Sequence, residues 1–361
     1  MTQDILQAFA LAAREPARLA DVAPQFRFAK VKPTDDCNSR CITCSYWETR
    51  HEGELSLTEV CDALAQLRGV GVTDVMFSGG EPTLRKDLPE MIAEAKRLGF
   101  SGISMTTNCL ALGEGKLDQL LEAGLGELVL SFEGESTHDA IRGVPGNAAK
   151  VHRVLEALVA RRDGGTYPNL SIKLATTLMS RTLDEVLGVL DLCRRHKVSV
   201  FFNLIDNGTY FFQGISESLF AIADLEAYDR LVDRLVAAKR AEPGLIGNSF
   251  SSLEYARRYF RDPKQADIPC YLGYVGLEVD ANGDIYSNCW GLPKMGNIRK
   301  TRLADIVGGK VYRQRCRDMY AKRCRGCSCG YILNLAYHPT SRDFDRAQGG
   351  TGNLTYAGER T

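Results

Sequence analysis

The sequence predicts an α/β fold built on a parallel sheet, and the pattern of apolar residues supports this prediction. From about residue 26 to residue 206, short apolar runs rich in β-branched residues alternate with stretches in which apolar residues recur at the 3.6-residue period of a helix. Strands separated by helical stretches imply parallel pairing. In parallel α/β folds the reactive groups collect at the carboxyl ends of the strands. The motifs described below fall at those ends, which indicates a functional site there.

The alternating part of the chain divides into predicted strands and helices in regular order. The predicted strands are residues 26–31, 74–78, 102–107, 127–132, 170–178 and 198–205. The predicted helices are residues 57–67, 87–97, 116–123, 148–161 and 183–196, and two further helical stretches follow at 217–240 and 251–261.

The C-terminal part has a different pattern. Residues 270–289 predict two strands joined at Ala281-Asn-Gly-Asp284, because Asn-Gly is the strongest short hairpin signal. Short helices are predicted near 303–307 and 312–320, and the polar, Gly-rich tail is expected to be loose. The predicted domains are a helical extension at 1–25, an α/β domain at 26–215, a helical linker at 216–265, a small hairpin and helix domain at 266–340 and a flexible tail at 341–361.

Composition and charge argue against several classes of partner. The 361 residues contain 45 Lys and Arg against 45 Asp and Glu, and this balance favours neither nucleic acid nor an anionic membrane as partner. No apolar stretch approaches the roughly 20 residues of a membrane span. The N-terminus has Asp4 where a signal peptide requires bases, so we expect an amphipathic helix there. The 12 cysteines then indicate metal binding or catalysis, not disulfides, in a cytoplasmic protein.

Three of these cysteines follow the first predicted strand at CxxxCxxC spacing, in Cys37-Asn-Ser-Arg-Cys41-Ile-Thr-Cys44. Three thiolates leave one iron of a four-iron cluster open to a ligand that is not protein, whereas a structural zinc site normally closes its own fourth position. A chance spacing and part of a zinc site are the alternatives. The spacing therefore predicts a cluster site with an open position.

Further motifs follow the next strands and make the cluster site the better interpretation. Ser78-Gly79-Gly80-Glu81-Pro82 ends the second strand, where glycines expose backbone carbonyls and Glu81 offers a carboxylate to an ammonium group. Thr106-Thr107-Asn108 ends the third strand, and Ser131 ends the fourth. Arg142 lies in His138-Asp-Ala-Ile-Arg-Gly143 and suits a carboxylate ligand. A simple Gly-Gly turn and a solvated surface arginine are the alternatives.

Together these motifs resemble those of the radical S-adenosylmethionine (SAM) superfamily. The resemblance implies an open partial (β/α)6 TIM-like barrel. It also implies that Cys37, Cys41 and Cys44 hold a [4Fe–4S] cluster with an open site, where SAM binds. The residues that the resemblance assigns to SAM are Ser78, Gly79, Gly80, Glu81, Pro82, Thr107, Asn108, Ser131 and Arg142.

The sequence departs from the family pattern at three positions. Cys109 stands where relatives carry a glycine, and we expect the local backbone to differ there. Glu133 replaces an aspartate, and Thr43 replaces an aromatic residue that contacts adenine in many relatives. The implied mechanism is a reductive cleavage of SAM with an electron from a flavodoxin or ferredoxin type of donor, and the resulting 5′-deoxyadenosyl radical abstracts a hydrogen atom from the substrate.

A second group of cysteines lies in the C-terminal part. By resemblance to the twitch module, a shortened SPASM domain, Cys270, Cys289, Cys324 and Cys327 are predicted to hold an auxiliary [4Fe–4S] cluster. Cys316 and Cys329 remain alternatives for one of these ligands. A zinc ribbon is the other interpretation, because a CxxC pair also suits Zn²⁺.

The substrate is the least constrained part of the prediction. Only about 25 residues precede the first strand, whereas peptide-modifying relatives often carry a recognition domain there. The first hypothesis is therefore oxidation or decarboxylation of a small sugar, aminocyclitol or nucleoside in natural-product biosynthesis. The second is modification of a peptide, as in ribosomal natural products or sulfatase maturation, and the third is a non-catalytic metal-binding module. The candidate substrate contacts lie at the end of the sixth strand and are Asn203, Asp206 and Asn207, with Tyr210 nearby, and an ordinary loop start is the alternative.

Overall fold

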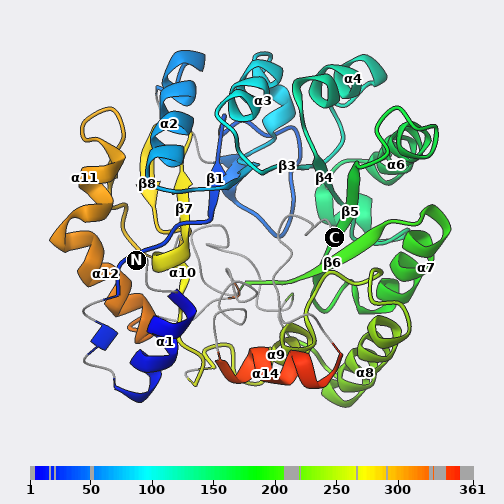
Figure 1. Cartoon of the computed structure of the whole chain (residues 1–361). Coiled ribbons are helices and arrows are strands. Elements are labelled where there is room, and N and C mark those ends of the chain that lie inside the picture. The colour runs from blue at the N-terminus through cyan, green and yellow to red at the C-terminus, as the bar shows by residue number, and fades with distance from the viewer. Residues whose placement is uncertain are drawn as a thin grey trace.

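The computed structural model describes residues 5–15, 18–19, 22–48, 53–206, 219, 221–265, 267–289, 292–324, 328 and 339–349. Within these residues a single sheet has the strand order β6-β5-β4-β3-β2-β1-β7-β8-β9. The sheet curves around the centre of the molecule without closing, and helices cover its outer face (Figure 1). This confirms the predicted α/β fold with an open parallel barrel.

The first six strands pair in parallel, each with its neighbour in sequence. They are β1 Phe28–Val31, β2 Asp74–Phe77, β3 Gly102–Thr107, β4 Glu127–Ser131, β5 Ser171–Leu178 and β6 Ser199–Leu204. The crossover helices are α2 Leu57–Gly69, α3 Leu88–Arg97, α4 Glu114–Ala123, α5 His138–Arg142, α6 Asn147–Asp163 and α7 Val186–His196. Local capping supports these bounds, since Ser56 and Glu59 form a capping box at the start of α2.

The two faces of the sheet differ in character. Residues that point outward, such as Met105, Leu130 and Phe202, are at most 1% exposed because they pack against the helices. Inward residues such as Lys173 and Asn203 are polar and keep part of their surface exposed. The hydrophobic core therefore lies between sheet and helices, which leaves the inner face available for a ligand.

The C-terminal part continues the same sheet. Strand β7 Gly276–Val279 pairs in parallel with β1, and β8 Asp284–Tyr286 pairs antiparallel with β7, which gives the predicted hairpin. Strand β9 Gly296–Asn297 and helices α11 Leu303–Gly308 and α12 Lys310–Tyr320 follow. One hydrophobic core cluster includes residues from both the α/β part and the C-terminal part. The predicted domain boundaries therefore do not coincide with separate cores, and they stay a prediction.

Residues 272–275 differ from the predicted strand and form helix α10 Leu272–Val275. The reason is an aromatic contact with helix α1 Ile5–Arg14, where the Phe9 ring centroid lies 4.5 Å from that of Tyr271 and 5.2 Å from that of Tyr274. Residues three apart share one face of a helix but lie on opposite faces of a strand, so only a helical turn brings both rings onto Phe9.

Residues 341–347, at the start of the predicted flexible tail, belong to helix α14 Pro339–Ala347. This helix packs on α9 Phe250–Tyr259. The buried Asp345 carboxylate accepts hydrogen bonds from the Ser251 N–H at 2.7 Å and the Ser251 hydroxyl at 2.8 Å. Helix α8 Leu225–Ala241 begins later than predicted, since Asp224 caps it through the Ala227 N–H. Among the described residues, no helix is long and apolar enough to span a membrane.

We predict that Asp345→Ala lowers the free energy of unfolding by about 1–3 kcal/mol, because the substitution leaves buried donors of α9 without an acceptor. Asp343→Ala on the exposed side of the same helix is the matched control and should change stability by less than about 0.5 kcal/mol. Urea denaturation measures both values. Equal effects of the two substitutions would contradict a docking role for Asp345.

Candidate functional site

The cysteine loop, residues 32–48, follows β1 and lies beside the segment that follows β2. The pairing of the two strands continues between these segments: the Ser78 N–H donates to the Val31 carbonyl at 3.0 Å and the Gly80 N–H to the Thr34 carbonyl at 3.1 Å. The Glu81 N–H then donates to the Asp36 carbonyl at 2.7 Å. The predicted SAM motif and the cysteine loop are therefore joined by backbone hydrogen bonds.

Only glycine permits this approach. A Cβ at Gly79 would lie 2.6 Å from the Thr34 carbonyl oxygen, and a Cβ at Gly80 would lie 2.1 Å from that of Asp36. Gly79 also has a φ of +126°, which L side chains rarely adopt. The sequence prediction explained these glycines by carbonyls exposed to a ligand, and the structure adds a second reason, close backbone packing.

Glu81 ties the end of β2 to the end of β3. Its Oε1 accepts hydrogen bonds from the hydroxyls of Thr83 at 2.6 Å and Thr107 at 2.8 Å, and its Oε2 accepts from the Asn108 N–H at 2.7 Å. Burial raises the pKa of Glu81, and these hydrogen bonds oppose that shift. The carboxylate is thus held by the protein, and its contact with an ammonium group of SAM stays a prediction.

Asn108 reaches from the end of β3 to the cysteine loop. Its side-chain N–H donates to Asn38 Oδ1 at 2.8 Å, to Ser39 Oγ at 3.0 Å and to Cys37 Sγ at 3.9 Å. The next residue, Cys109, has a φ of +69°. The backbone therefore takes the left-handed conformation that favours glycine, although the sequence departure suggested a different local backbone.

Arg142 contacts the loop at Arg40 and Cys41. The Arg40 N–H donates to the Arg142 carbonyl at 3.0 Å, and a Cβ at Gly143 would lie 2.4 Å from the Arg40 carbonyl oxygen. The guanidinium donates to Glu133 Oε1 at 2.6 Å and to Cys41 Sγ at 3.9 Å. Its buried Nε has no hydrogen-bond partner among the described residues. Arg142 is thus a largely buried cation beside Cys41, not a solvated surface residue.

The remaining residues assigned to SAM lie around the same edge of the sheet. Ser131 is buried at the end of β4, and Pro82 opens the 3₁₀ turn Pro82–Leu84, which Glu81 caps. Thr107 accepts a hydrogen bond from the Cys109 N–H as well as donating to Glu81. The structure therefore brings the predicted motifs together, and their contacts with SAM stay predictions.

The three thiols fit a cluster with thiolate ligands. Each thiol sulfur accepts a hydrogen bond from an N–H group. Cys44 Sγ accepts from the Tyr46 N–H at 3.3 Å, Cys37 Sγ from the Asn108 side chain and Cys41 Sγ from Arg142. Burial raises the pKa of Cys37 and of Cys44 to about 11. Ligation to iron replaces those protons, and N–H···S bonds stabilise the resulting thiolate charge. Among the described residues, no group of three or more His, Cys, Asp or Glu side chains is close enough together to hold a single metal ion. A four-iron cluster does not require such a group, because each thiolate binds a different iron.

The second group of cysteines is described in part. Cys270 and Cys289 contact one small apolar cluster that includes Met76 and Leu272, and Cys324 is half-buried. Cys316 is buried and its thiol donates to the Gly273 carbonyl at 3.1 Å, which gives it a structural partner. Cys327 and Cys329 lie outside the described residues.

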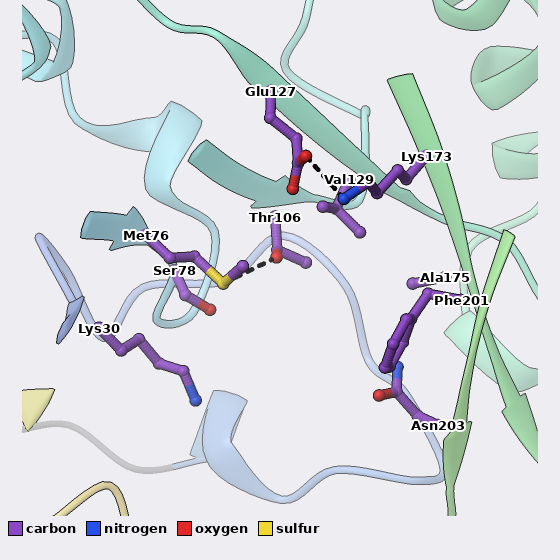
Figure 2. Close-up of a pocket in the computed structure, with 10 residues that line it drawn as sticks. All are labelled: Lys30, Met76, Ser78, Thr106, Glu127, Val129, Lys173, Ala175, Phe201 and Asn203. Atoms are coloured by element: carbon purple, nitrogen blue, oxygen red, sulfur yellow. Dashed lines mark hydrogen bonds and ion pairs between the residues drawn. The ribbon is translucent and has the colours of Figure 1, made fainter. Parts of the chain in front are cut away.

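A cavity of about 250 Å³ lies on the inner face of the sheet (Figure 2). Its lining side chains come from β1 to β6 and the residue after β2, and they are Lys30, Met76, Ser78, Thr106, Glu127, Val129, Lys173, Ala175, Phe201 and Asn203. The Lys173 ammonium lies 2.7 Å from the Glu127 carboxylate. Ser78 belongs both to this lining and to the segment bonded to the cysteine loop, so cavity and loop adjoin.

The candidate substrate contacts lie in different places. Asn203 lines the cavity, and its contact with a substrate stays a prediction, whereas Asp206 is buried and accepts a hydrogen bond from the Ser328 N–H. Asn207 and Tyr210 lie outside the described residues. Lys30, Glu127 and Lys173 were missed, although each is the only charged residue of its strand and lies at an alternate position. That alternation was the available signal, because it places the charges on the inner face.

Comparison with known families agrees with this geometry. The sequence model of the Radical SAM superfamily matches residues 31–193, and the SPASM model, an iron–sulfur cluster-binding domain, matches residues 270–329. The chain therefore contains a radical SAM domain and a SPASM domain. Its radical SAM domain implies a [4Fe–4S] cluster and SAM, and its SPASM domain implies auxiliary iron–sulfur clusters, in agreement with the predicted cofactors.

Two curated relatives illustrate the range of similarity. The PqqA peptide cyclase of Xanthomonas axonopodis pv. citri is 28% identical over 273 residues, which are 73% of this chain and 69% of the relative. The GTP 3′,8-cyclase of Chlorobaculum tepidum is 32% identical over 187 residues, which are 48% of this chain and 52% of the relative. The chain thus spans about half the length of the GTP cyclase.

Solved structures share the fold of this radical SAM chain. Streptococcus suis SuiB bound to S-adenosylmethionine has a TM-score of 0.66 at 16% identity, over 86% of this chain and 71% of SuiB. Native anSMEcpe with bound AdoMet and Cp18Cys peptide has a TM-score of 0.59 at 16% identity, over 80% of this chain and 81% of that chain. At this identity the likeness shows the fold.

We predict that Gly80→Ala prevents assembly of the radical SAM cluster, because the added Cβ separates the SAM motif from the cysteine loop. Anaerobic reconstitution should then yield about four fewer irons per chain than the wild type. Gly115→Ala in α4 is the control, since a Cβ there meets nothing within 4 Å. Full iron loading of Gly80→Ala would show that the close approach is dispensable.

Proposed function

We propose that this radical SAM chain modifies a peptide. The cysteine loop initiates the radical reaction, and a substrate residue places its side chain in the cavity of Figure 2, where a hydrogen atom is removed. The reaction is an oxidation or a ring closure on that residue: one hydrogen atom goes to 5′-deoxyadenosine, the second leaves as a proton, and a bound iron–sulfur cluster would accept the remaining electron. A flavodoxin or ferredoxin type of protein is the proposed electron donor.

Similarity to the peptide cyclase is the main support from relatives. That alignment takes in 73% of the chain, more than the radical SAM domain alone, whereas the GTP cyclase alignment takes in 48%. SuiB bound to precursor peptide SuiA has the same fold, with a TM-score of 0.62 over 94% of this chain and 80% of SuiB. These findings favour the peptide hypothesis over the sugar or nucleoside hypothesis.

The cavity is the structural observation that carries the proposal. Small-molecule sites commonly have about 300–1,000 Å³. At about 250 Å³ the cavity formed by the described residues suits one inserted side chain better than a whole sugar nucleotide. The earlier preference for a small sugar-like substrate rested on the short segment before the first strand, and the position where a sequence begins carries no information about its substrate.

The residues of the chain have separable tasks in this proposal. When bound, the cluster supplies the electron that cleaves SAM to a 5′-deoxyadenosyl radical. Arg142 places a positive charge beside Cys41 and so offsets thiolate charge. Met76, Val129 and Phe201 give the cavity apolar walls that limit water near a reactive radical. Lys30, Asn203 and the Glu127–Lys173 pair offer charged and hydrogen-bonding groups for orienting a substrate residue.

A nucleotide substrate is the second candidate, because the GTP cyclase shares 32% identity over the aligned 187 residues. A nucleoside triphosphate carries several negative charges, whereas both lysines of the cavity already lie near a carboxylate. Lys173 pairs with Glu127 at 2.7 Å, and Lys30 lies 3.8 Å from Glu278. The charge of the described lining therefore favours the peptide.

The proposal predicts that reduced, reconstituted enzyme with SAM changes the mass of a synthetic peptide. The peptides to test are the products of short reading frames beside this gene, and the expected change is the loss of two hydrogen atoms with formation of 5′-deoxyadenosine. GTP is the comparison substrate. Consumption of GTP with every peptide unchanged would replace the proposal by the second candidate.

We further predict that Asn203→Ala lowers kcat/KM for the modified peptide by about tenfold, because one hydrogen bond to the substrate is lost. The ratio of 5′-deoxyadenosine to modified peptide should rise, since a poorly held residue lets the radical react elsewhere. Chromatographic quantification of both products checks this. An unchanged ratio and rate would place the substrate outside this cavity.

A further inference from the structure

Backbone hydrogen bonds join the C-terminal hairpin to the chain on both sides of the cysteine loop. The Lys32 N–H donates to the Val279 carbonyl at 2.9 Å, which extends the β1–β7 pairing into the loop. The Leu55 N–H donates to the Ala281 carbonyl at 2.7 Å. The chain thus contacts the hairpin both where it enters the loop and shortly after it leaves the loop.

A first side-chain bridge runs through Arg299 and Glu54. Arg299, two residues after β9, donates to the backbone carbonyls of Gly53 at 2.6 Å and Glu54 at 3.0 Å, and pairs with the Glu59 carboxylate at 2.6 Å. The Glu54 carboxylate accepts from the Thr34 hydroxyl at 2.7 Å and the Asp35 N–H at 2.8 Å. Arg299 therefore fixes the backbone of Glu54, and the Glu54 side chain in turn binds Thr34 and Asp35, which shortly precede Cys37.

A second bridge runs through Tyr46 at the other end of the loop. The Tyr46 side chain is 1% exposed, and its hydroxyl is hydrogen-bonded to Asp35 and, at 2.9 Å, to Asp280 Oδ1 at the end of β7. The Lys32 ammonium lies 4.3 Å from the centroid of the Tyr46 ring. Lys32 in turn pairs with Glu278 at 2.9 Å and lies 3.7 Å from Asp280. These contacts set the position of Tyr46, whose own N–H donates to Cys44 Sγ.

We propose that Tyr46 and Glu54 are positioning residues through which Asp280 and Arg299 of the C-terminal domain set the geometry of the Cys37–Cys44 loop. Hydrogen bonds to cluster sulfurs influence the reduction potential of an iron–sulfur cluster. The Tyr46 N–H···S contact therefore gives the hairpin an influence on the radical SAM cluster. This influence acts through contacts and requires no electron transfer from the auxiliary cluster.

The test uses the full-length, reconstituted protein with SAM and a reductant but no peptide. The variants are Tyr46→Phe, which removes the hydroxyl from between two buried carboxyl groups, and Arg299→Ala. Tyr312→Phe and Arg302→Ala are the matched controls. Tyr312 is equally buried and its hydroxyl donates to the Gly273 carbonyl, and Arg302 also pairs with α2, at Asp62, but touches neither Glu54 nor the loop.

Three measurements distinguish positioning from general stability. Hydrogen exchange of loop amides between residues 35 and 48 should be about tenfold faster in both variants than in the wild type and the controls. The midpoint potential of the radical SAM cluster should become more negative in Tyr46→Phe, because a donor to Cys44 is less well placed. The rate of 5′-deoxyadenosine formation at saturating SAM should fall about tenfold, while Glu54→Gln, which keeps an acceptor oxygen, should retain more activity than Glu54→Ala.

Wild-type exchange and an unchanged potential in Tyr46→Phe and Arg299→Ala would overturn the proposal. Equal changes in Tyr312→Phe and Arg302→Ala would also overturn it, since the effect would then be general destabilisation. If Tyr46→Phe does not fold, Arg299→Ala and the Glu54 pair carry the same comparison. Because no peptide is present, an incorrect substrate assignment leaves these results unaffected.

Discussion

The continued pairing of the chain beyond β1 and β2 is the constraint on which the site depends. Two strands that end side by side would normally separate into independent loops. Here the backbones of residues 78–81 and 31–36 stay within hydrogen-bond distance, which is possible because Gly79 and Gly80 have no side chains. Glu81, in the same segment, accepts hydrogen bonds from Thr107 and Asn108 at the end of β3. The Asn108 side chain then donates to Asn38 in the cysteine loop. The thiols are thus ordered by a closed set of contacts around one loop.

The two faces of the sheet divide stability and chemistry between them. Burial of the outer face against helices supplies the hydrophobic core, so the inner face can carry charged and polar side chains as well as apolar ones. Charged residues such as Lys173 and Glu127 are tolerated there because they pair with each other beside a cavity. The hairpin β7–β8 closes one side of this arrangement and belongs to the same sheet as the radical SAM strands.

Local features were readable from the sequence, and features made by distant contacts were not. Strand periodicity predicted β3 at its observed bounds and β2 to within one residue, and Asn-Gly predicted the turn between β7 and β8. Helix α10 was missed because its cause is a contact with Phe9, more than 250 positions away. Helix α14 was missed for a similar reason, since Ser251 and Asp345 are far apart in sequence. The cysteine spacing identified the family, but the partners of Tyr46, Glu54 and Glu81 required the fold.

We propose that Cys37, Cys41 and Cys44 together form the site that cleaves SAM. The most direct measurement is 5′-deoxyadenosine formation by anaerobically reconstituted, reduced protein in which these three cysteines are replaced by alanine, with Cys61→Ala in α2 as the control. We expect the triple variant to form no 5′-deoxyadenosine while the control forms it at the wild-type rate. Formation of 5′-deoxyadenosine by the triple variant would show that these cysteines do not make the cleavage site.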